Sequence, residues 1–573
     1  MINTDRRNIV PALRVTKTCG TRHGAERRKP FEVPDDMLAA VRDDVMLRRA
    51  ERGLEWFGNQ RSVILAANPE NRNTAALAGY LSQWIDAGAD RETLRELVGG
   101  FQPHVRAQLS LNGYVQLRLA EGMLSLADGN VNAASAHFDF IISVEQEPVL
   151  DNEVATLAHF WKAICQRERG ELDDAMEEAS RGRGIATALG YVPAAAMIQA
   201  LEGCLNIQKG RLVRGAEQLR DAQEALSGTG DFISLGNIHS GYGSAALEEG
   251  RYEMALDHFA SAINDYQRGN PRYTGNARAL VDLAHTQRLI TLGIARSIDA
   301  GAERRRGSAA TSRAGLKLEA SATRQRVERL RDEAFSNLAR ASDIYTSCRN
   351  GHGLALARLE RGFLLLDCGD FDRAAIEANE TFDAAARKRD YAIMARSRLV
   401  HSKIETAQYE EGIGDTPAAH AQRAYDFARD ALTYAKQTED RRLLARVYTC
   451  QGLIYCCDFF NNGEAARECR QYAGELLIPG NRNELWDDYQ ALAAKVLRTG
   501  AVDSKLQKWT QGIAEEKSFQ QMTEEFADLV IPSIWEHEER NVSRVVARLS
   551  ISPKKVRRVL GRVGVKAGRD RGE

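Results

Sequence analysis

Small residues recur along this chain in pairs that lie twelve positions apart, within long stretches that contain few prolines and few runs of β-branched residues. The pairs are Gly122/Ala134, Ala163/Ala175, Gly203/Gly215, Gly243/Ala255 and Gly362/Ala374, and Gly452 precedes Ala465 with one extra residue. The second members of the first four pairs are 41, 40 and 40 residues apart. A small residue allows two antiparallel helices to approach closely, and a fixed period of this length indicates stacked helical hairpins.

The clearest copy of this pattern runs from His239 to Ala262, with Gly250 and Tyr252 at the turn between the two expected helices. It resembles the tetratricopeptide repeat, although the signature Trp and Pro are mostly absent and the period is nearer 40 than about 34 residues. HEAT and armadillo units have a similar length but lack the pairing of small residues. Other copies place the same turn at Gly129-Asn-Val131, Gly170-Glu-Leu172, Gly210-Arg-Leu212 and Gly369-Asp-Phe371. We therefore predict an all-α fold, a tetratricopeptide-like α-solenoid of ~40-residue hairpins over residues 35–500, followed by a small C-terminal helix-turn-helix.

One repeat is interrupted, because the small residue Ala284 is followed by its expected partner Ala334 only 50 positions later. The insert, about residues 297–326, is basic. Its flanks have a helical period, so one interpretation is a hairpin arm that contacts nucleic acid or a partner. The other is a flexible loop, since residues 307–312 have a disorder-like composition. The residues proposed for a basic arm are Arg304, Arg305, Arg306 and Arg313.

The two flanking regions differ from the repeats. Residues 1–34 are basic with little apolar periodicity and are expected to be disordered; Met37 could be the true first residue. Helices are then expected at about 35–57, 73–88 and 90–99. Residues 501–520 are a polar connector, 521–567 form the terminal module with an amphipathic helix over 522–539, and 568–573 are a tail.

The terminal module is strongly basic. Between Arg540 and Glu573 eleven Lys or Arg residues face only two acidic ones, whereas the whole chain has a formal net charge of −1. Residues 541–549 and 553–561 are predicted to be two short helices, with a turn at Ser550-Ile-Ser552 and Pro553 at the first helical position. Val556, Val559 and Leu560 form the apolar side of the second helix, which leaves its basic residues to project outward. Such a cationic surface indicates a polyanionic partner.

This segment resembles the helix-turn-helix of the Fis family, which also ends sigma-54-dependent activators. The matching residues are Asn541, Ser543, Arg544, Leu549, Ile551, Ser552, Arg558, Leu560 and Gly564. The resemblance implies that DNA is contacted by the second helix, for which the candidate residues are Ser552, Lys554, Lys555, Arg557, Arg558 and Arg562. Two departures are Val546, where the family has Ala, and Ser550, where it has a glycine at positive φ. The plainer alternative is a solvated basic helix that binds nothing specific.

Searches for catalytic chemistry are negative: there is no P-loop, dinucleotide-binding fingerprint, HExxH or nucleophile elbow, and the nine cysteines lack metal-ligand spacing. No enzyme activity, metal or cofactor is therefore expected. No export signal or membrane span is evident, which indicates a cytoplasmic protein associated with the nucleoid when bound to DNA.

These features predict a transcriptional regulator of bacterial type. Its solenoid would bind a peptide or protein in the groove, its terminal module would bind DNA, and it could act as a homodimer. The order of modules is similar to that of MalT-type regulators without their ATPase. The alternative is a non-enzymatic scaffold or adaptor whose basic end docks a protein or RNA.

Overall fold

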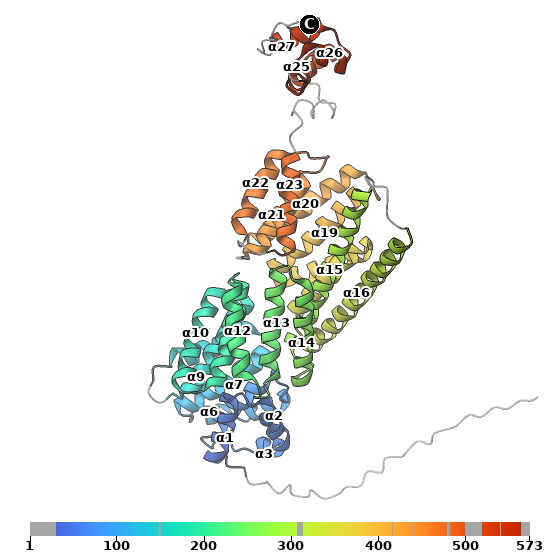
Figure 1. Cartoon of the computed structure of the whole chain (residues 1–573). Coiled ribbons are helices and arrows are strands. Elements are labelled where there is room, and N and C mark those ends of the chain that lie inside the picture. Colours follow the sequence, from blue (N-terminus) through green and yellow to red (C-terminus); the bar gives the residue numbers. More distant parts are fainter. Residues whose placement is uncertain are drawn as a thin grey trace, which may run out of the picture.

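The computed structural model describes residues 30–147, 150–305, 313–414, 416–438, 440–477, 482–498, 518–538 and 540–562. Helices account for all the regular structure in these ranges, apart from one isolated bridge between Phe31 and Ala67. Most of the basic N-terminal segment, the polar connector from 501 to 517 and the tail lie outside them. The predicted all-α class is confirmed (Figure 1).

The N-terminal helices are short. They are α1 (Asp35–Met46), α2 (Ala50–Asn59), α3 (Arg61–Leu65), α4 (Thr74–Leu81), η1 (Ser82–Trp84), α5 (Arg91–Gly99) and α6 (Pro103–Arg106). The single helix expected at 35–57 is therefore wrong, since the chain breaks at Arg48, whose φ is +54°. The Arg48 side chain is buried, and its Nε donates to Asp231 Oδ2 at 2.7 Å. The break thus places the Arg48 guanidinium against Asp231, which is 183 residues further along the chain and directly precedes a helix.

The solenoid consists of antiparallel hairpins that follow one another along the chain (Figure 1). The paired helices are α7 (Leu111–Ala127) with α8 (Val131–Ser143), α9 (Asn152–Arg169) with α10 (Leu172–Ala188), α11 (Val192–Gln208) with α12 (Leu212–Leu226), α13 (Phe232–Glu248) with α14 (Tyr252–Gly269), α15 (Thr274–Arg305) with α16 (Arg313–Ser347), α17 (Gly351–Asp367) with α18 (Phe371–Lys388), α19 (Tyr391–Glu411) with α20 (Pro417–Ala435), and α21 (Arg441–Tyr455) with α22 (Gly463–Leu476). α23 (Glu484–Arg498) follows the last hairpin.

The paired small residues lie where the two helices of a hairpin touch. A β-carbon on Gly203 would sit 3.0 Å from the Gly215 carbonyl oxygen, and one on Gly215 would sit 2.7 Å from the Gly203 carbonyl oxygen. The alanines of the other pairs are fully buried: Ala134, Ala163, Ala175, Ala255 and Ala374. The exception is the last hairpin, where the fully buried residue is Ala466 and the predicted Ala465 is half-buried. The close approach of helices therefore accounts for the sequence period.

The turns inside the hairpins are also as predicted. Each ends its first helix with a glycine in the left-handed region, at φ between +72° and +86°: Gly129, Gly170, Gly210, Gly250 and Gly369. The amide of this glycine and the next amide donate back to carbonyls of the last helical turn. Only glycine adopts this conformation without strain, which explains why the turn is readable in the sequence.

The interrupted repeat is a hairpin of two long helices. Ala284 on α15 and Ala334 on α16 share one buried cluster, as the pattern of small residues predicts. The helices continue into the insert, α15 as far as Arg305 and α16 from Arg313 (Figure 1). Of the proposed arm residues, Arg304 and Arg305 end α15, Arg313 begins α16, and Arg306 lies outside the described residues. The arm is helical on both sides of its tip, and its binding role stays a prediction.

Candidate nucleic-acid interface

Three helices form the C-terminal module: α25 (Phe519–His537), α26 (Val542–Leu549) and α27 (Pro553–Arg562). They share one buried apolar cluster, with Ile551 and Val546 partly buried against it. Its members are Ala527, Ile531, Trp535, Val542, Val545, Val556, Val559 and Leu560. The predicted apolar side of the second helix is fully buried, since Val556, Val559 and Leu560 are each 0% exposed. The basic segment therefore has a core of its own.

The ends of the two short helices are fixed by polar side chains. The Asn541 Oδ1 accepts from the amides of Ser543 (2.9 Å) and Arg544 (3.2 Å), which caps α26. Ser550 ends that helix at φ +52°, so the left-handed conformation persists although serine replaces glycine. Ser552 Oγ accepts from the Lys555 amide at 3.3 Å, and α27 starts at Pro553 as expected. These contacts fix the angle at which the second helix leaves the turn.

The side of α27 opposite the core is cationic. Lys554, Arg557 and Arg558 are exposed there, and Lys555 is half-buried at the margin. Gly561 lies on the same side, and a β-carbon on it would meet nothing within 4 Å. The exposed side of α27 thus combines three long cations with a flat backbone patch. We call Lys554, Arg557, Arg558 and Gly561 the α27 face.

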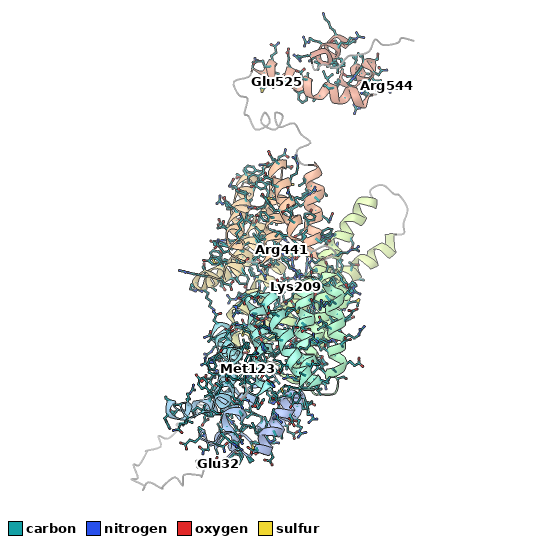
Figure 2. All side chains as sticks on the ribbon, turned by 90° about the vertical axis from the view of Figure 1, so that its left-hand side faces the viewer. Glu32, Met123, Lys209, Arg441, Glu525 and Arg544 are labelled. Atoms are coloured by element: carbon teal, nitrogen blue, oxygen red, sulfur yellow. The ribbon has the colours of Figure 1, made fainter. Side chains whose placement is uncertain are left out.

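Arg562 is placed differently from the other candidate residues. Its guanidinium pairs with Asp528 at 2.5 Å and Glu524 at 2.9 Å, both on α25. The hydrogen bonds that Arg562 donates to these two carboxylates raise its pKa. Arg548 likewise pairs with Glu538. Arg544 on α26 is exposed (Figure 2). Arg562 therefore braces α27 against α25, and its charge is already paired there.

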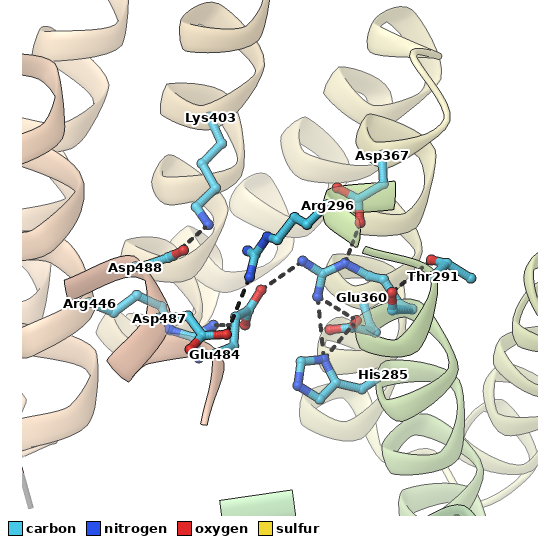
Figure 3. A network of polar contacts seen from close by, with 11 residues as sticks. His285, Thr291, Arg296, Glu360, Asp367, Lys403, Arg446, Glu484, Asp487 and Asp488 are labelled. Atoms are coloured by element: carbon cyan, nitrogen blue, oxygen red, sulfur yellow. Dashed lines mark hydrogen bonds and ion pairs between the residues drawn. The ribbon is translucent and has the colours of Figure 1, made fainter. Parts of the chain in front are cut away.

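A second charged site lies within the solenoid, around Arg288 of α15. This guanidinium, 4% exposed, lies 2.7 Å from Asp367, 2.9 Å from Glu484 and 3.3 Å from Glu360. His285 contacts Glu360 at 2.9 Å, and Figure 3 shows these side chains converging from three helices. Further pairs extend the network to α19 and α21: Lys403 with Asp488 at 3.3 Å and Arg446 with Glu484 at 3.6 Å.

The electrostatics of the Arg288 network are those of a desolvated ion cluster. Burial alone would raise the pKa of Glu484, but Arg288, Arg446 and Lys403 outweigh it and lower that pKa well below its usual range. Burial likewise opposes ionisation of Glu360, and His285 with Arg288 lowers its pKa to about 2. Charges that are buried together must be paired, because an unpaired one would be very costly.

Segment 482–484 crosses from this network to the end of α13. Glu248 accepts from Arg442 at 2.6 Å and from the Asn483 side chain at 2.7 Å. The Arg482 amide donates to the Glu248 carbonyl at 2.8 Å. These contacts join the end of α13 to α21 and to the segment before α23. Sequence reasoning missed these contacts, since no local pattern links residues about 200 positions apart.

No protein-family model matches the chain, and no curated protein matches it. Solved structures do. The apo form of the quorum sensor NprR from B. thuringiensis is 12% identical over 70% of this chain and 97% of its own, with a TM-score of 0.45. A Rap protein complexed with Competence and Sporulation Factor is 11% identical over 70% and 99%, with a TM-score of 0.44. A human IFIT1 dimer with m7Gppp-AAAA is 13% identical over 78% and 96%, with a TM-score of 0.42. At such scores the fold assignment rests on the helices and turns of the chain itself.

Two further properties bear on the chemistry. None of the helices in the described ranges is long and apolar enough to cross a membrane. Among the same residues, His, Cys, Asp and Glu form no group of three or more that could hold a metal ion.

Proposed function

We propose that the protein is a DNA-binding regulator in which α26 and α27 act as a helix-turn-helix. The observation that carries the proposal is the α27 face, where three cations and an open glycine lie on the side of the second helix that faces away from its core. In such modules the second helix enters the major groove, where Lys and Arg donate to guanine O6 and N7 or to phosphates. Gly561 lets the backbone approach the DNA without steric hindrance.

α25 supplies a surface on which a second copy can pack. Phe519 is 82% exposed and Phe526 is 46% exposed. They lie seven residues apart on α25, about two helical turns, on the side away from its core residues Ala527 and Ile531. Two such faces packed together would remove both aromatic rings from water. A dimer formed this way would present two α27 helices, which on DNA bind half-sites about 34 Å apart.

The solenoid is assigned the binding of a peptide or protein partner, which stacked helical hairpins serve by their extended surfaces. The Arg288 network limits where this occurs, because its charged side chains on α15, α17 and α23 are already paired with one another. A partner that binds there must break ion pairs, which would couple binding to the shape of the solenoid. No catalytic role is assigned.

The test is DNA binding by the full chain, measured by fluorescence anisotropy against genomic and random duplexes over a range of salt. Four to six phosphate contacts predict a log–log salt slope of about −4 to −5. The variant K554A/R557A/R558A should lose binding, whereas R562A should retain it because Arg562 is already paired to α25.

If the triple variant binds as tightly as the native chain, the assignment of α27 as the recognition helix is wrong. The second candidate is an adaptor whose basic end docks an acidic protein or RNA. It is favoured if duplex DNA of every sequence binds equally and weakly while RNA or an acidic polypeptide binds tightly to the same face.

A further inference from the structure

Three helices that are second in their hairpins, α10, α16 and α18, end in the same hydrogen-bond pattern. After α10, the Gly190 amide donates to the Thr187 carbonyl and the next amide donates to Ala186, both at 3.0 Å. After α16, the Arg349 amide donates to Thr346 at 3.1 Å and the next amide to Tyr345 at 2.9 Å. After α18, the Arg389 amide donates to Ala386 at 3.2 Å and the next amide to Ala385 at 3.0 Å. Gly190, Arg349 and Arg389 therefore occupy one and the same structural position.

At this position the backbone is left-handed in each case, with φ of +79° at Gly190, +54° at Arg349 and +56° at Arg389. The β-carbon of an arginine crowds its own carbonyl in this conformation, so glycine is the more stable choice. Gly190 shows that the fold accepts glycine there. Two arginines at such a site are thus not explained by the turn, and a strained residue of this kind points to function.

Side-chain contacts connect three successive junctions between hairpins into one edge. The Cys348 Sγ donates to the Arg272 carbonyl at 3.2 Å, which joins the α14–α15 junction to the α16–α17 junction. The His352 Nδ1 lies 2.8 Å from Asp390 Oδ2, which joins the latter to the α18–α19 junction. The Lys388 Nζ lies 2.8 Å from where a β-carbon on Gly351 would be.

This edge carries exposed cations, which we call the arginine edge: Arg272, Arg349, Arg387, Lys388 and Arg389. Within the part of the chain that the structure describes, no ion pair engages any of these five side chains. Of the nearby carboxylates, Asp390 is held by His352, and Asp383 is exposed one turn before Arg387. The excess of positive charge is therefore local and accessible.

Aromatic surface accompanies these cations. Tyr391 follows the arginine edge directly and is 38% exposed at the start of α19. Cations that track a backbone, together with an exposed ring on which a base can stack, are the two elements of single-strand recognition. A single small anion would not require charges over three junctions, and a run of Asp and Glu residues has no flat ring to stack on Tyr391.

We propose that the arginine edge binds single-stranded nucleic acid, with Arg349, Lys388 and Arg389 on phosphates and Tyr391 stacked on a base. Guanidinium groups suit phosphate because they donate two parallel hydrogen bonds. This surface is separate from the α27 face and would be used independently of it.

The test uses the full chain with K554A/R557A/R558A as background, so that the α27 face does not contribute. The probe is a fluorescein-labelled oligothymidylate of about 16 nucleotides. R349G/R389G should bind about tenfold more weakly at moderate salt, with a log–log slope smaller by about 1.4 for two phosphates on a single strand. Its thermal midpoint should be equal to or above that of the background protein, since glycine relieves the left-handed strain.

Three companion variants make the result decisive. R349K/R389K keeps the charges and should keep most of the affinity, and Y391A should weaken binding of the single strand only. R211A/R214A removes two exposed arginines near the start of α12 and should leave binding unchanged. The proposal is overturned if R349G/R389G binds normally, if R211A/R214A loses as much affinity, or if only polyglutamate competes for the edge.

Discussion

Arg288 and Glu484 meet at 2.9 Å although 196 residues separate them in the chain. Both side chains are almost fully buried, at 4% and 9% exposure. The contact joins α15 to α23 and places a carboxylate against a guanidinium that also contacts two other acidic residues. One arginine thus joins α15 to both α17 and α23.

Removing Glu484 should destabilise the fold strongly. In E484A a buried guanidinium loses a partner, which typically costs about 3 kcal/mol. The urea midpoint of the full chain reports the loss. The matched control is D487A, whose ion pair with Arg296 is exposed and should contribute less than about 1 kcal/mol. Equal effects of the two variants would contradict the assignment of Arg288 as a buried centre.

The same network predicts that the stability of the fold depends on pH in the acid range. The pKa of Glu360 is about 2 in the folded chain, below its ordinary value of 4.5. Its contribution is therefore fully present above about pH 4.5 and is lost as the pH falls toward 2. A shift of this size is worth on the order of 3 kcal/mol. In E360Q the urea midpoint should change less between pH 5 and pH 3 than in the native chain.

Two glycines inside helices should respond to alanine in opposite ways. A β-carbon on Gly243 would lie 2.6 Å from the ring of Phe259, which is fully buried, so G243A should cost about 1–3 kcal/mol. Gly184 lies within α10 and a β-carbon there meets nothing within 4 Å. G184A should therefore stabilise by up to about 1 kcal/mol, since alanine favours the helix. Thermal midpoints of the two variants test both signs.

The turn of the C-terminal module offers a similar contrast. Ser550 is left-handed at φ +52°, so S550G should stabilise the module by about 1 kcal/mol. S552A should do the reverse, because it removes the side-chain acceptor of the Lys555 amide and leaves only the Ser552 carbonyl at 2.9 Å. Hydrogen exchange of the α26 and α27 amides reports both changes. If the α26 and α27 amides exchange faster in S550G than in the native chain, Ser550 is not strained in its left-handed conformation.

Much of the solenoid could be predicted because its requirements are local. The contact between two helices requires a small residue, as at Gly203, and the turn requires a left-handed glycine, as at Gly250. Both kinds of residue recur at a fixed spacing in the sequence. The break at Arg48 has no such local pattern, because no glycine or proline causes it. The Arg48 side chain is instead paired with Asp231, which is distant in the sequence. Ala466 was missed because the link between α21 and α22, residues 456–462, is longer than the link in most other hairpins and shifts the register.

The α27 face followed from helical periodicity, because a buried stripe of three residues fixes which positions point outward. The role of Arg562 did not follow. Its partners Asp528 and Glu524 are 34 and 38 residues earlier in the chain, and only the packing of α25 brings them close. The arginine edge was also invisible to sequence reasoning, since a positive φ at arginine has no sequence signature.

Repeat proteins usually lose stability one unit at a time when they are shortened, because each unit touches only its neighbours. The ion pair between Arg48 and Asp231 removes that independence at the beginning of this chain. A shortened chain that starts after α2 would leave a fully buried aspartate without its cation, several hairpins from the cut. Fragments for expression should therefore keep residues from about 30 onward together with α13, or replace Asp231.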